Sequence, residues 1–266
     1  MNRYLQAAQE IARQAGDLLL DEFQKSHKFE YKGGVEIVTA ADRRSEEFIV
    51  ERLRTFFPPH AIIGEEGGER ATESDYCWYV DPLDGTTNFA HGYPLFAVSM
   101  ALVRSGEILV GVVHDPVRAE TFYAVRGEGA WLNQKRIQVS VTEQLSESLL
   151  ATGFNAQQRN RGTNIHYYNR FNLLTHGVRR DGSAALDLCY VACGRFDGFW
   201  EFNLKSWDTA AGTLVAREAG GLVTDLKGLP YRLGDVELAA SNGRIHPTMQ
   251  EVFAEVSEQA ARAPAS

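Results

Sequence analysis

Two carboxylates three positions apart dominate the segment WYVDPLDGTTNFAH, residues 78–91. The apolar run before Asp81 is typical of a buried strand, and Pro82 prevents regular hydrogen bonding beyond it. A tight turn through Pro82 and Leu83 would bring Asp84 back beside Asp81. Two ionised carboxylates that close repel each other unless one is protonated or a cation lies between them. The spacing therefore indicates a cation site, with an ordinary Asp-rich turn as the alternative.

The residues that follow add donors for an anion. Gly85 allows a close backbone approach or an unusual φ angle. The run Thr86, Thr87 and Asn88 is typical of the first turn of a helix, whose free N–H groups favour a negatively charged group. Oxygen ligands for a cation would then lie next to an N–H cradle for a phosphate.

Two other acidic segments are expected at the ends of secondary-structure elements. Glu65 and Glu66 follow the apolar run AIIG, and in KSWDTAAG we expect Ser206 to cap a helix that carries Asp208 in its first turn. An exposed acidic turn and a simple capping residue are the alternatives. Taken with the first segment, they fit one site built from oxygen ligands, which suits Mg²⁺ rather than zinc or copper.

The elements that must position these residues alternate along the chain. Apolar residues recur at helical spacing over residues 5–23, and a second helix is expected from about Ala40 to Phe57, before two prolines. A strand meander follows at AIIG, CWYVD, FAVSMALVR, EILVGVVHD and TFYAV. The second half alternates strands at LLATGF, DGFWE, GLVTD and ELAASN with helices at HYYNRFNLL, SAALDLCYVACG, SWDTAAGTLVAREAGG and after Pro247. This pattern predicts an α/β protein in stacked layers.

Bulk properties limit the classes of function. The 266 residues carry a net charge of −8, so nucleic acid is not expected as a partner and an anionic substrate needs a local cation or helix terminus. We expect no secretory signal and no membrane span, because the N-terminus lacks a basic start before an apolar run and no long uncharged run occurs. Only three cysteines are present, which favours a reducing cytoplasm over a disulfide framework.

The order and spacing of GEE, DPLDGTTNFAH and WDTAAG resemble the inositol monophosphatase family of Mg²⁺-dependent, lithium-sensitive phosphatases. The resemblance runs from the Lys32 region to the helix after Gly220. It implies a layered αβαβα sandwich of the sugar-phosphatase type, shared with fructose-1,6-bisphosphatase. It also implies one domain over residues 1–266, with halves of about 1–145 and 146–266, and a homodimer.

The same resemblance implies a set of site residues. Two or three Mg²⁺ ions per subunit would be held by the carboxylates of Glu65, Asp81, Asp84 and Asp208 and by the main-chain oxygen of Leu83. Thr86, paired with Asp42 in VTAAD, would hold the attacking water, and the N–H groups of Gly85 and Thr86 would hold the phosphate. Lys32 in YKGGVE resembles a lysine on the family's mobile loop near the site.

For the substrate, the resemblance nominates Ser183 and Ala184 in RRDGSAALD and Glu201, which precedes Asp208 by seven residues. The implied reaction is Mg²⁺-dependent hydrolysis of myo-inositol 1-phosphate to inositol and phosphate by direct attack of a metal-activated water. Relatives on the same scaffold hydrolyse fructose 1,6-bisphosphate, histidinol phosphate, NADP or adenosine bisphosphate, and these remain alternatives. The segment 179–181, RRD, either tunes this choice or forms a solvated turn.

Two rival functions are weighed against this one. An aspartate followed by DGT resembles the haloacid dehalogenase motif, which forms an aspartyl-phosphate. That motif has one residue between its aspartates and lies on the first strand, whereas here two residues separate Asp81 and Asp84. The other rival is a non-catalytic phosphosugar sensor or scaffold. Carboxylates at every expected ligand position argue against it, because a binding module would not need them all.

Overall fold

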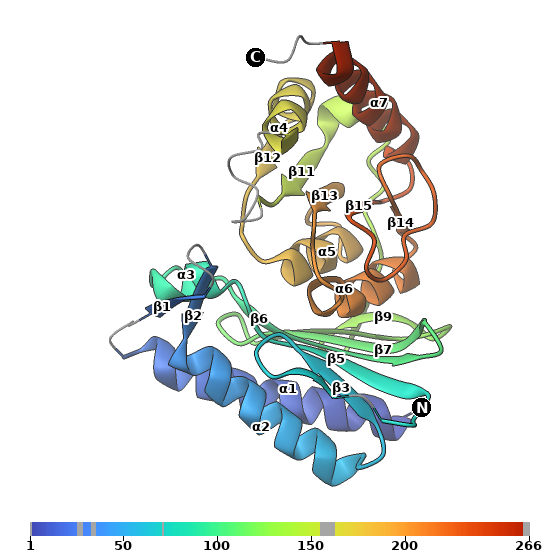
Figure 1. Ribbon diagram of the computed structural model, residues 1–266. Helices are drawn as coiled ribbons and strands as arrows, with labels where there is room; N and C mark the ends of the chain where they lie inside the picture. The colour runs from blue at the N-terminus through green and yellow to red at the C-terminus, as the bar shows by residue number, and fades with distance from the viewer. Residues whose placement is uncertain (1, 26–28, 33–35, 71, 155–162, 263–266) are drawn as a thin grey trace.

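The computed structural model describes residues 2–25, 29–32, 36–70, 72–154 and 163–262. Five layers are stacked in the order helix, sheet, helix, sheet, helix (Figure 1). The helical layers are α1 (Asn2–Phe23) with α2 (Ala40–Phe56), α5 (Ala184–Ala192) with α6 (Ser206–Glu218), and α4 (Thr163–Leu174) with α7 (His246–Arg262). The predicted αβαβα sandwich is confirmed, because each apolar sheet face is covered by helices.

The first sheet has eight strands in the order β10-β9-β8-β7-β6-β5-β3-β4. Its strands are β3 (Ala61–Gly64), β4 (Gly68–Arg70), β5 (Tyr76–Asp84), β6 (Ala97–Arg104), β7 (Glu107–Asp115), β8 (Glu120–Val125), β9 (Gly129–Leu132) and β10 (Lys135–Ile137). Alternate residues of β5 face opposite layers: Trp78 and Val80 pack among apolar residues of α1 and α2, whereas Tyr79 packs toward α5 and α6. Both faces of the sheet are therefore buried.

The second sheet has five strands in the order β12-β11-β13-β15-β14. They are β11 (Leu149–Thr152), β12 (Gly177–Arg179), β13 (Gly198–Phe202), β14 (Leu222–Thr224) and β15 (Glu237–Ser241). Strand β11 is parallel to both β12 and β13. One face packs on α4 and α7, where the rings of Phe171, Trp200 and Phe253 meet.

The central helical layer is thin where it meets the first sheet. Small residues on both sides allow this contact: a Cβ on Gly111 of β7 would lie 2.7 Å from the carbonyl oxygen of Ala211 in α6. On its other side, Gly212 leaves room for Leu188 of α5. This close packing brings the beginning of α6 against the sheet that carries the DPLD segment.

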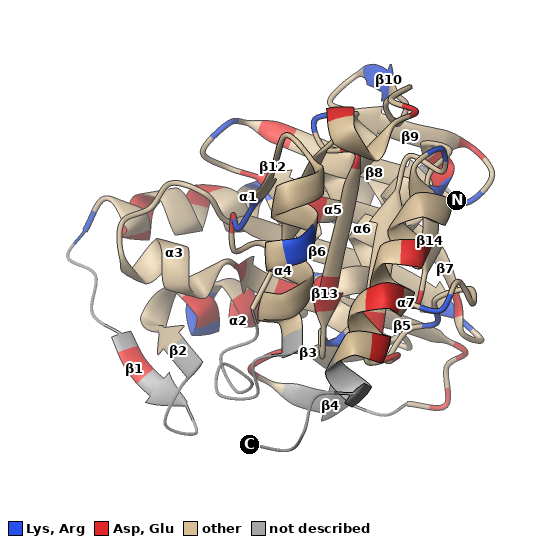
Figure 2. Ribbon diagram, turned by 90° about the horizontal axis from the view of Figure 1, so that it is seen from above, with Lys and Arg blue, Asp and Glu red and all other residues tan. Residues whose placement is uncertain are grey.

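Short elements complete the chain. The hairpin of β1 (Phe29–Lys32) and β2 (Glu36–Thr39) lies beside α3 (Thr86–Ala90) (Figure 1), and a 3₁₀ turn spans Leu145–Glu147. Basic and acidic residues are interspersed over the outer helices and loops (Figure 2). Among the described residues, no helix combines the length and the apolar character needed to cross a membrane.

The expected tight turn through Pro82 and Leu83 is wrong. Strand β5 continues to Asp84, with Asp81 opposite Ser99 of β6 and Asp84 opposite Ala97. The three-residue advance from Asp81 to Asp84 along β5 thus matches a two-residue advance along β6, which is a β-bulge. Pro82 fits here because a bulge leaves residues outside the ladder, so its missing N–H costs no hydrogen bond.

Candidate active site

A pocket of about 150 Å³ lies where the bulge in β5, the beginning of α3 and the central helical layer meet. It is lined by Glu65, Asp81, Leu83, Asp84, Gly85, Thr86, Gly153, Arg180, Gly182, Ala184, Glu201, Leu204 and Asp208. A larger groove of about 640 Å³ runs along α2, but of the residues that the sequence suggests for the site only Glu66 lines it. The smaller pocket is therefore the candidate site, since it gathers residues from both halves of the chain.

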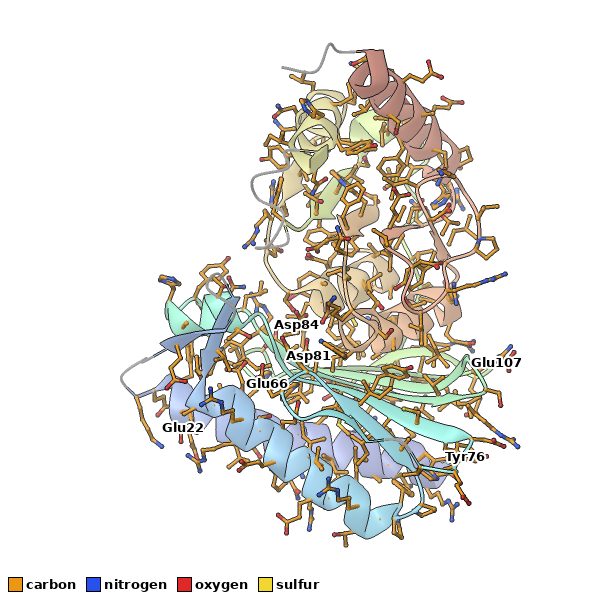
Figure 3. The ribbon with its side chains drawn as sticks, viewed as in Figure 1. Glu22, Glu66, Tyr76, Asp81, Asp84 and Glu107 are labelled. Carbon is orange, nitrogen blue, oxygen red and sulfur yellow. The ribbon has the colours of Figure 1, made fainter. Side chains whose placement is uncertain are left out.

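The bulge presents two carboxylates at the junction between the halves (Figure 3). Asp81 is 2% exposed, and its Oδ1 accepts a hydrogen bond of 3.0 Å from the N–H of Leu83. Asp84 Oδ2 accepts from the hydroxyl of Ser183 at 2.6 Å and from the N–H of Ala185 at 2.8 Å. The beginning of α5 therefore orients Asp84.

Glu65 and Asp208 reach the pocket from two other elements. Glu65 follows β3, which is parallel to β5, so the carboxyl ends of both strands meet at the same edge of the sheet. Asp208 lies in the first turn of α6, and its Oδ2 accepts from the N–H of Lys205 at 2.7 Å. The predicted N-cap Ser206 is wrong, because Lys205 has the extended backbone of a cap and Ser206 is already helical.

Burial and mutual repulsion dominate the electrostatics. Burial raises the pKa of Asp81 well above its usual value, and the charges of Glu65, Asp84 and Asp208 raise it further. Burial raises the pKa of Asp84 to about 6, against the opposing hydrogen bond from Ser183. The pKa of Glu201 rises to about 8, by burial and then by Asp208 and Asp84. Such a cluster holds its charge at neutral pH only if a cation compensates it.

The donor set fits Mg²⁺ in its chemistry. The predicted ligands supply only carboxylate and carbonyl oxygens, all lining one pocket. Within the part of the chain that the structure describes, no three or more His, Cys, Asp or Glu side chains are already arranged as a metal cage. Asp81, Asp84 and Asp208 each accept a hydrogen bond from a backbone N–H, which offsets part of their mutual repulsion.

The raised pKa values predict how the metal-free protein responds to pH. Folding raises the pKa of Asp84 from 3.8 to about 6 and that of Glu201 from 4.5 to about 8, so the folded state binds more protons than the unfolded chain between about pH 4 and pH 8. Their contribution to stability should therefore fall as pH rises through this window.

Burial lowers the pKa values of His60, His114 and His246, which acts in the opposite direction, so the test compares two proteins. The Tm of the wild type in EDTA minus that of Glu201→Gln should decrease from pH 5 to pH 8, and the same difference for the exposed Asp21→Asn should not. A wild-type minus Glu201→Gln difference that rises with pH would contradict the account.

Thr86 and Asp42 form a hydrogen-bonded pair beside the carboxylates. Asp42 is 1% exposed in the first turn of α2, where its Oδ2 accepts from the N–H of Thr39 at 2.8 Å. Its Oδ1 lies 3.0 Å from the hydroxyl of Thr86, which is also 3.0 Å from the carbonyl of Leu83. Burial raises the pKa of Asp42, and the hydrogen bonds from Thr39 and Thr86 oppose this shift.

Gly85 connects the bulge to α3. Its φ of 98° lies in the left-handed region, and a Cβ there would lie 3.0 Å from the carbonyl oxygen of Leu95. Both the backbone conformation and the lack of space therefore favour glycine at position 85. Helix α3 begins at Thr86, so its first N–H groups have no partner within the helix and are available to an anion.

Only some of the residues predicted to contact substrate line the pocket. Ala184 and Glu201 line the pocket, and a Cβ on Gly153 would collide with the Glu201 carboxylate. Ser183 is 1% exposed and donates to Asp84, so its hydroxyl serves the carboxylate cluster. Lys32 ends strand β1, paired with Glu36, and its side chain lies outside the described residues.

Sequence reasoning left Arg180 open between tuning the substrate and forming a solvated turn, and did not assign Gly153, Gly182 and Leu204 to the site; all four line the pocket. Arg180 is the only lysine or arginine among the described lining residues. Its proximity to GSAA was a usable signal, but the alternative of a solvated turn fitted equally well. No sequence pattern marks Gly153 or Leu204 as a site residue, because isolated glycines and leucines occur in many structural roles.

Comparison with known proteins agrees with this geometry. The family model described as the inositol monophosphatase family matches residues 1–262. The chain belongs to this family. An inositol-1-monophosphatase of Synechocystis is 43% identical over 259 residues, which is 96% of this chain and 90% of the relative. A Pseudomonas aeruginosa protein named Nus factor SuhB is 46% identical over 250 residues, covering 91% of this chain and 92% of the relative.

Solved structures of the family show the same fold. An inositol monophosphatase from Anabaena superposes with a TM-score of 0.87 at 41% identity, covering 96% of each chain. An IMPase from Thermotoga maritima has a TM-score of 0.90 at 38% identity, covering 97% of this chain and 99% of the other. Family and fold together identify a phosphatase enzyme that acts on small phosphorylated molecules.

Proposed function

We propose that the protein is a Mg²⁺-dependent phosphomonoesterase that hydrolyses myo-inositol 1-phosphate to inositol and phosphate. The observation that carries the proposal is the pocket itself, in which Glu65, Asp81, Asp84 and Asp208 surround the space next to the Thr86–Asp42 pair. Relatives named inositol-1-monophosphatase support the choice of substrate.

The chain's own residues account for the steps of the reaction. Glu65, Asp81, Asp84, Asp208 and the Leu83 carbonyl would hold two or three Mg²⁺ ions. Bound Mg²⁺ would lower the pKa of water and neutralise charge on the phosphoryl oxygens. Thr86 Oγ would accept a hydrogen bond from the attacking water while donating to Asp42, which takes up the proton. The N–H groups of Gly85 and Thr86 would hold the phosphate.

The bonds that change are few. The water oxygen forms a bond to phosphorus as the bond from phosphorus to the inositol oxygen breaks. The leaving oxygen takes a proton from solvent water to become a hydroxyl, and Asp42 returns to solvent the proton that it took from the attacking water. No covalent intermediate on the protein is needed, because the carboxylates nearest the phosphate are assigned to the cations. Lys32, on the hairpin beside α3, is proposed to approach the same site.

Glu201 and the backbone at Ala184 are proposed to bind the polyol. Glu201 is 8% exposed and reaches the pocket from β13, so its carboxyl group can accept a hydrogen bond from a sugar hydroxyl. Arg180 adds a positive charge at the same pocket, which would favour a substrate with a second anionic group. A bisphosphate such as fructose 1,6-bisphosphate is therefore the second candidate, and histidinol phosphate and NADP are further ones.

A panel of these esters assayed for kcat/KM tests the substrate. The name Nus factor SuhB of the P. aeruginosa relative leaves the substrate open, so this comparison does not decide it. A preference of tenfold or more for myo-inositol 1-phosphate supports the proposal, and an equal preference for another ester refutes it. Absence of turnover on every ester with Mg²⁺ would favour the sensor or scaffold.

The ion requirement gives a direct prediction. Activity should be lost after exhaustive chelation and restored by Mg²⁺, whereas Ca²⁺ should inhibit, because it is larger, accepts looser coordination and activates water poorly. Phosphate release should be measured with each ion added to the chelated protein. Full activity in the presence of chelator would contradict the assignment. On the family resemblance we also expect lithium to inhibit.

Three wider properties belong to the same proposal. We infer that residues 1–266 act as one domain, because residues from both proposed halves line the pocket. A cytoplasmic location is supported by the three cysteines, none of which forms a disulfide in the described structure. The homodimer stays a prediction from the family resemblance.

A further inference from the structure

Helix α2 carries three buried polar residues on one face. Asp42, Ser45 and Glu46 occupy positions i, i+3 and i+4, which lie together on a helix. Their exposed fractions are 1%, 0% and 4%. Buried polar groups at the same face of a helix are costly unless each has a hydrogen-bond partner. We call these three residues the polar stripe.

Each member of the polar stripe binds a different segment of the pocket. Asp42 accepts from Thr86 at the beginning of α3, at 3.0 Å. The hydroxyl of Ser45 donates to the carbonyl of Pro82 in the β5 bulge, at 2.9 Å. Glu46 Oε2 accepts from the N–H of Glu66, at 2.8 Å. One helix therefore touches all three segments that enter the pocket from the N-terminal half.

The Glu46 contact is the most tightly built of the three. A Cβ on Gly64 would lie 2.6 Å from Glu46 Oε2, and a Cβ on Gly67 would collide with Oε1. Both glycines flank Glu65 and Glu66, so the turn that follows β3 wraps around the Glu46 carboxylate. Figure 3 shows Glu66 on the α2 side of Asp81.

We propose that Glu46 is a positioning residue that sets the affinity of the pocket for its divalent cation. It does so by holding the Gly64–Gly67 turn, and hence Glu65, in place opposite Asp81. The Glu46 side chain is buried, so removing the acceptor of the Glu66 N–H is costly. This inference rests on the proposed function only in taking the carboxylate pocket as the cation site, and Glu46 itself does not line that pocket.

The test measures Mg²⁺ binding by titration calorimetry, separately from turnover. Glu46→Ala should weaken Mg²⁺ binding about tenfold or more, the usual effect of losing a group that orients a ligand. Its kcat at saturating Mg²⁺ should stay close to that of the wild type. Glu46→Gln keeps an oxygen acceptor for the Glu66 N–H and should recover much of the affinity. Glu47→Gln is the matched control, because Glu47 is the exposed neighbour on the same helix.

A second variant tests the contact from its other side. Gly67→Ala should also weaken Mg²⁺ binding, because its Cβ displaces the Glu46 carboxylate. Added to Glu46→Ala, the same change should cost little more, since the space is then free. Two results would overturn the inference. One is that the losses of Mg²⁺ affinity in the two single variants add up in the double variant, and the other is that folded Glu46→Ala binds Mg²⁺ within twofold of the wild type. If the wild type binds Mg²⁺ but hydrolyses no ester, the proposed function is refuted. The Mg²⁺ affinities of the variants still test the role of Glu46 in that case.

Discussion

Asp208→Asn is expected to lower kcat by about two to three orders of magnitude, the scale of losing one preorganised electrostatic group. The carboxylate lies in the pocket at the first turn of α6, and its Oδ2 accepts from the Lys205 N–H at 2.7 Å. Asparagine can accept the same bond, so the helix keeps its cap. The free energy of unfolding in EDTA should change little or rise, because one of several repelling charges is removed.

The comparison requires turnover at saturating Mg²⁺ and urea unfolding in EDTA for the same protein samples. Asp21→Asn removes the same charge from an exposed position on α1 and should leave both quantities unchanged. If Asp208→Asn retains turnover within twofold of the wild type, Asp208 does not serve the cation. A large loss of stability would instead mean that its main role is structural.

Thr86→Val is the second substitution with a large expected effect, a fall in kcat of about two to three orders of magnitude. It removes the hydroxyl that lies 3.0 Å from Asp42, and with it the group that would orient the attacking water. The backbone N–H of residue 86 remains, so phosphate binding and KM should change little. Valine and threonine have similar shapes, which limits the disturbance to α3.

Two further variants separate the hydroxyl from the fold. Thr86→Ser restores an Oγ at the same position and should recover most of the turnover. Thr87→Val makes the same change at the adjacent exposed position and should be nearly neutral. A Thr86→Val protein with unchanged kcat would show that the Thr86–Asp42 pair does not handle the water.

Long periodic elements could be predicted from the sequence, whereas short ones could not. The apolar spacing over residues 5–23 predicts α1 to within three residues, and the prolines after Phe57 help to predict α2 to within one. Strands β4, β10 and β12 have three residues each, too few for an alternating pattern to appear. They form because neighbouring strands supply hydrogen-bond partners, which is a property of the assembled sheet.

The ends of the elements that carry site residues were also predictable, but their local geometry was not. Glu65 follows β3 and Asp208 lies in the first turn of α6, as expected. A bulge replaced the expected turn at Pro82 because β6 continues to pair with β5 as far as Asp84. The phase of α2 places Glu46 on the buried face with Ile49 and Leu53 and leaves Glu47 exposed. What the sequence does not show is that the Glu46 carboxylate meets the turn after β3.

The central claim is that water held at the Thr86–Asp42 pair attacks phosphorus directly, with Asp81 and Asp84 occupied by cations. Single-turnover hydrolysis of a chiral thiophosphate ester in isotopically labelled water tests it most directly. Direct attack is a single in-line displacement, so the account predicts inversion at phosphorus, with the label entering the released thiophosphate in that one step. Net retention, or a phosphoenzyme trapped on Asp81 or Asp84, would show a covalent two-step mechanism and contradict the account.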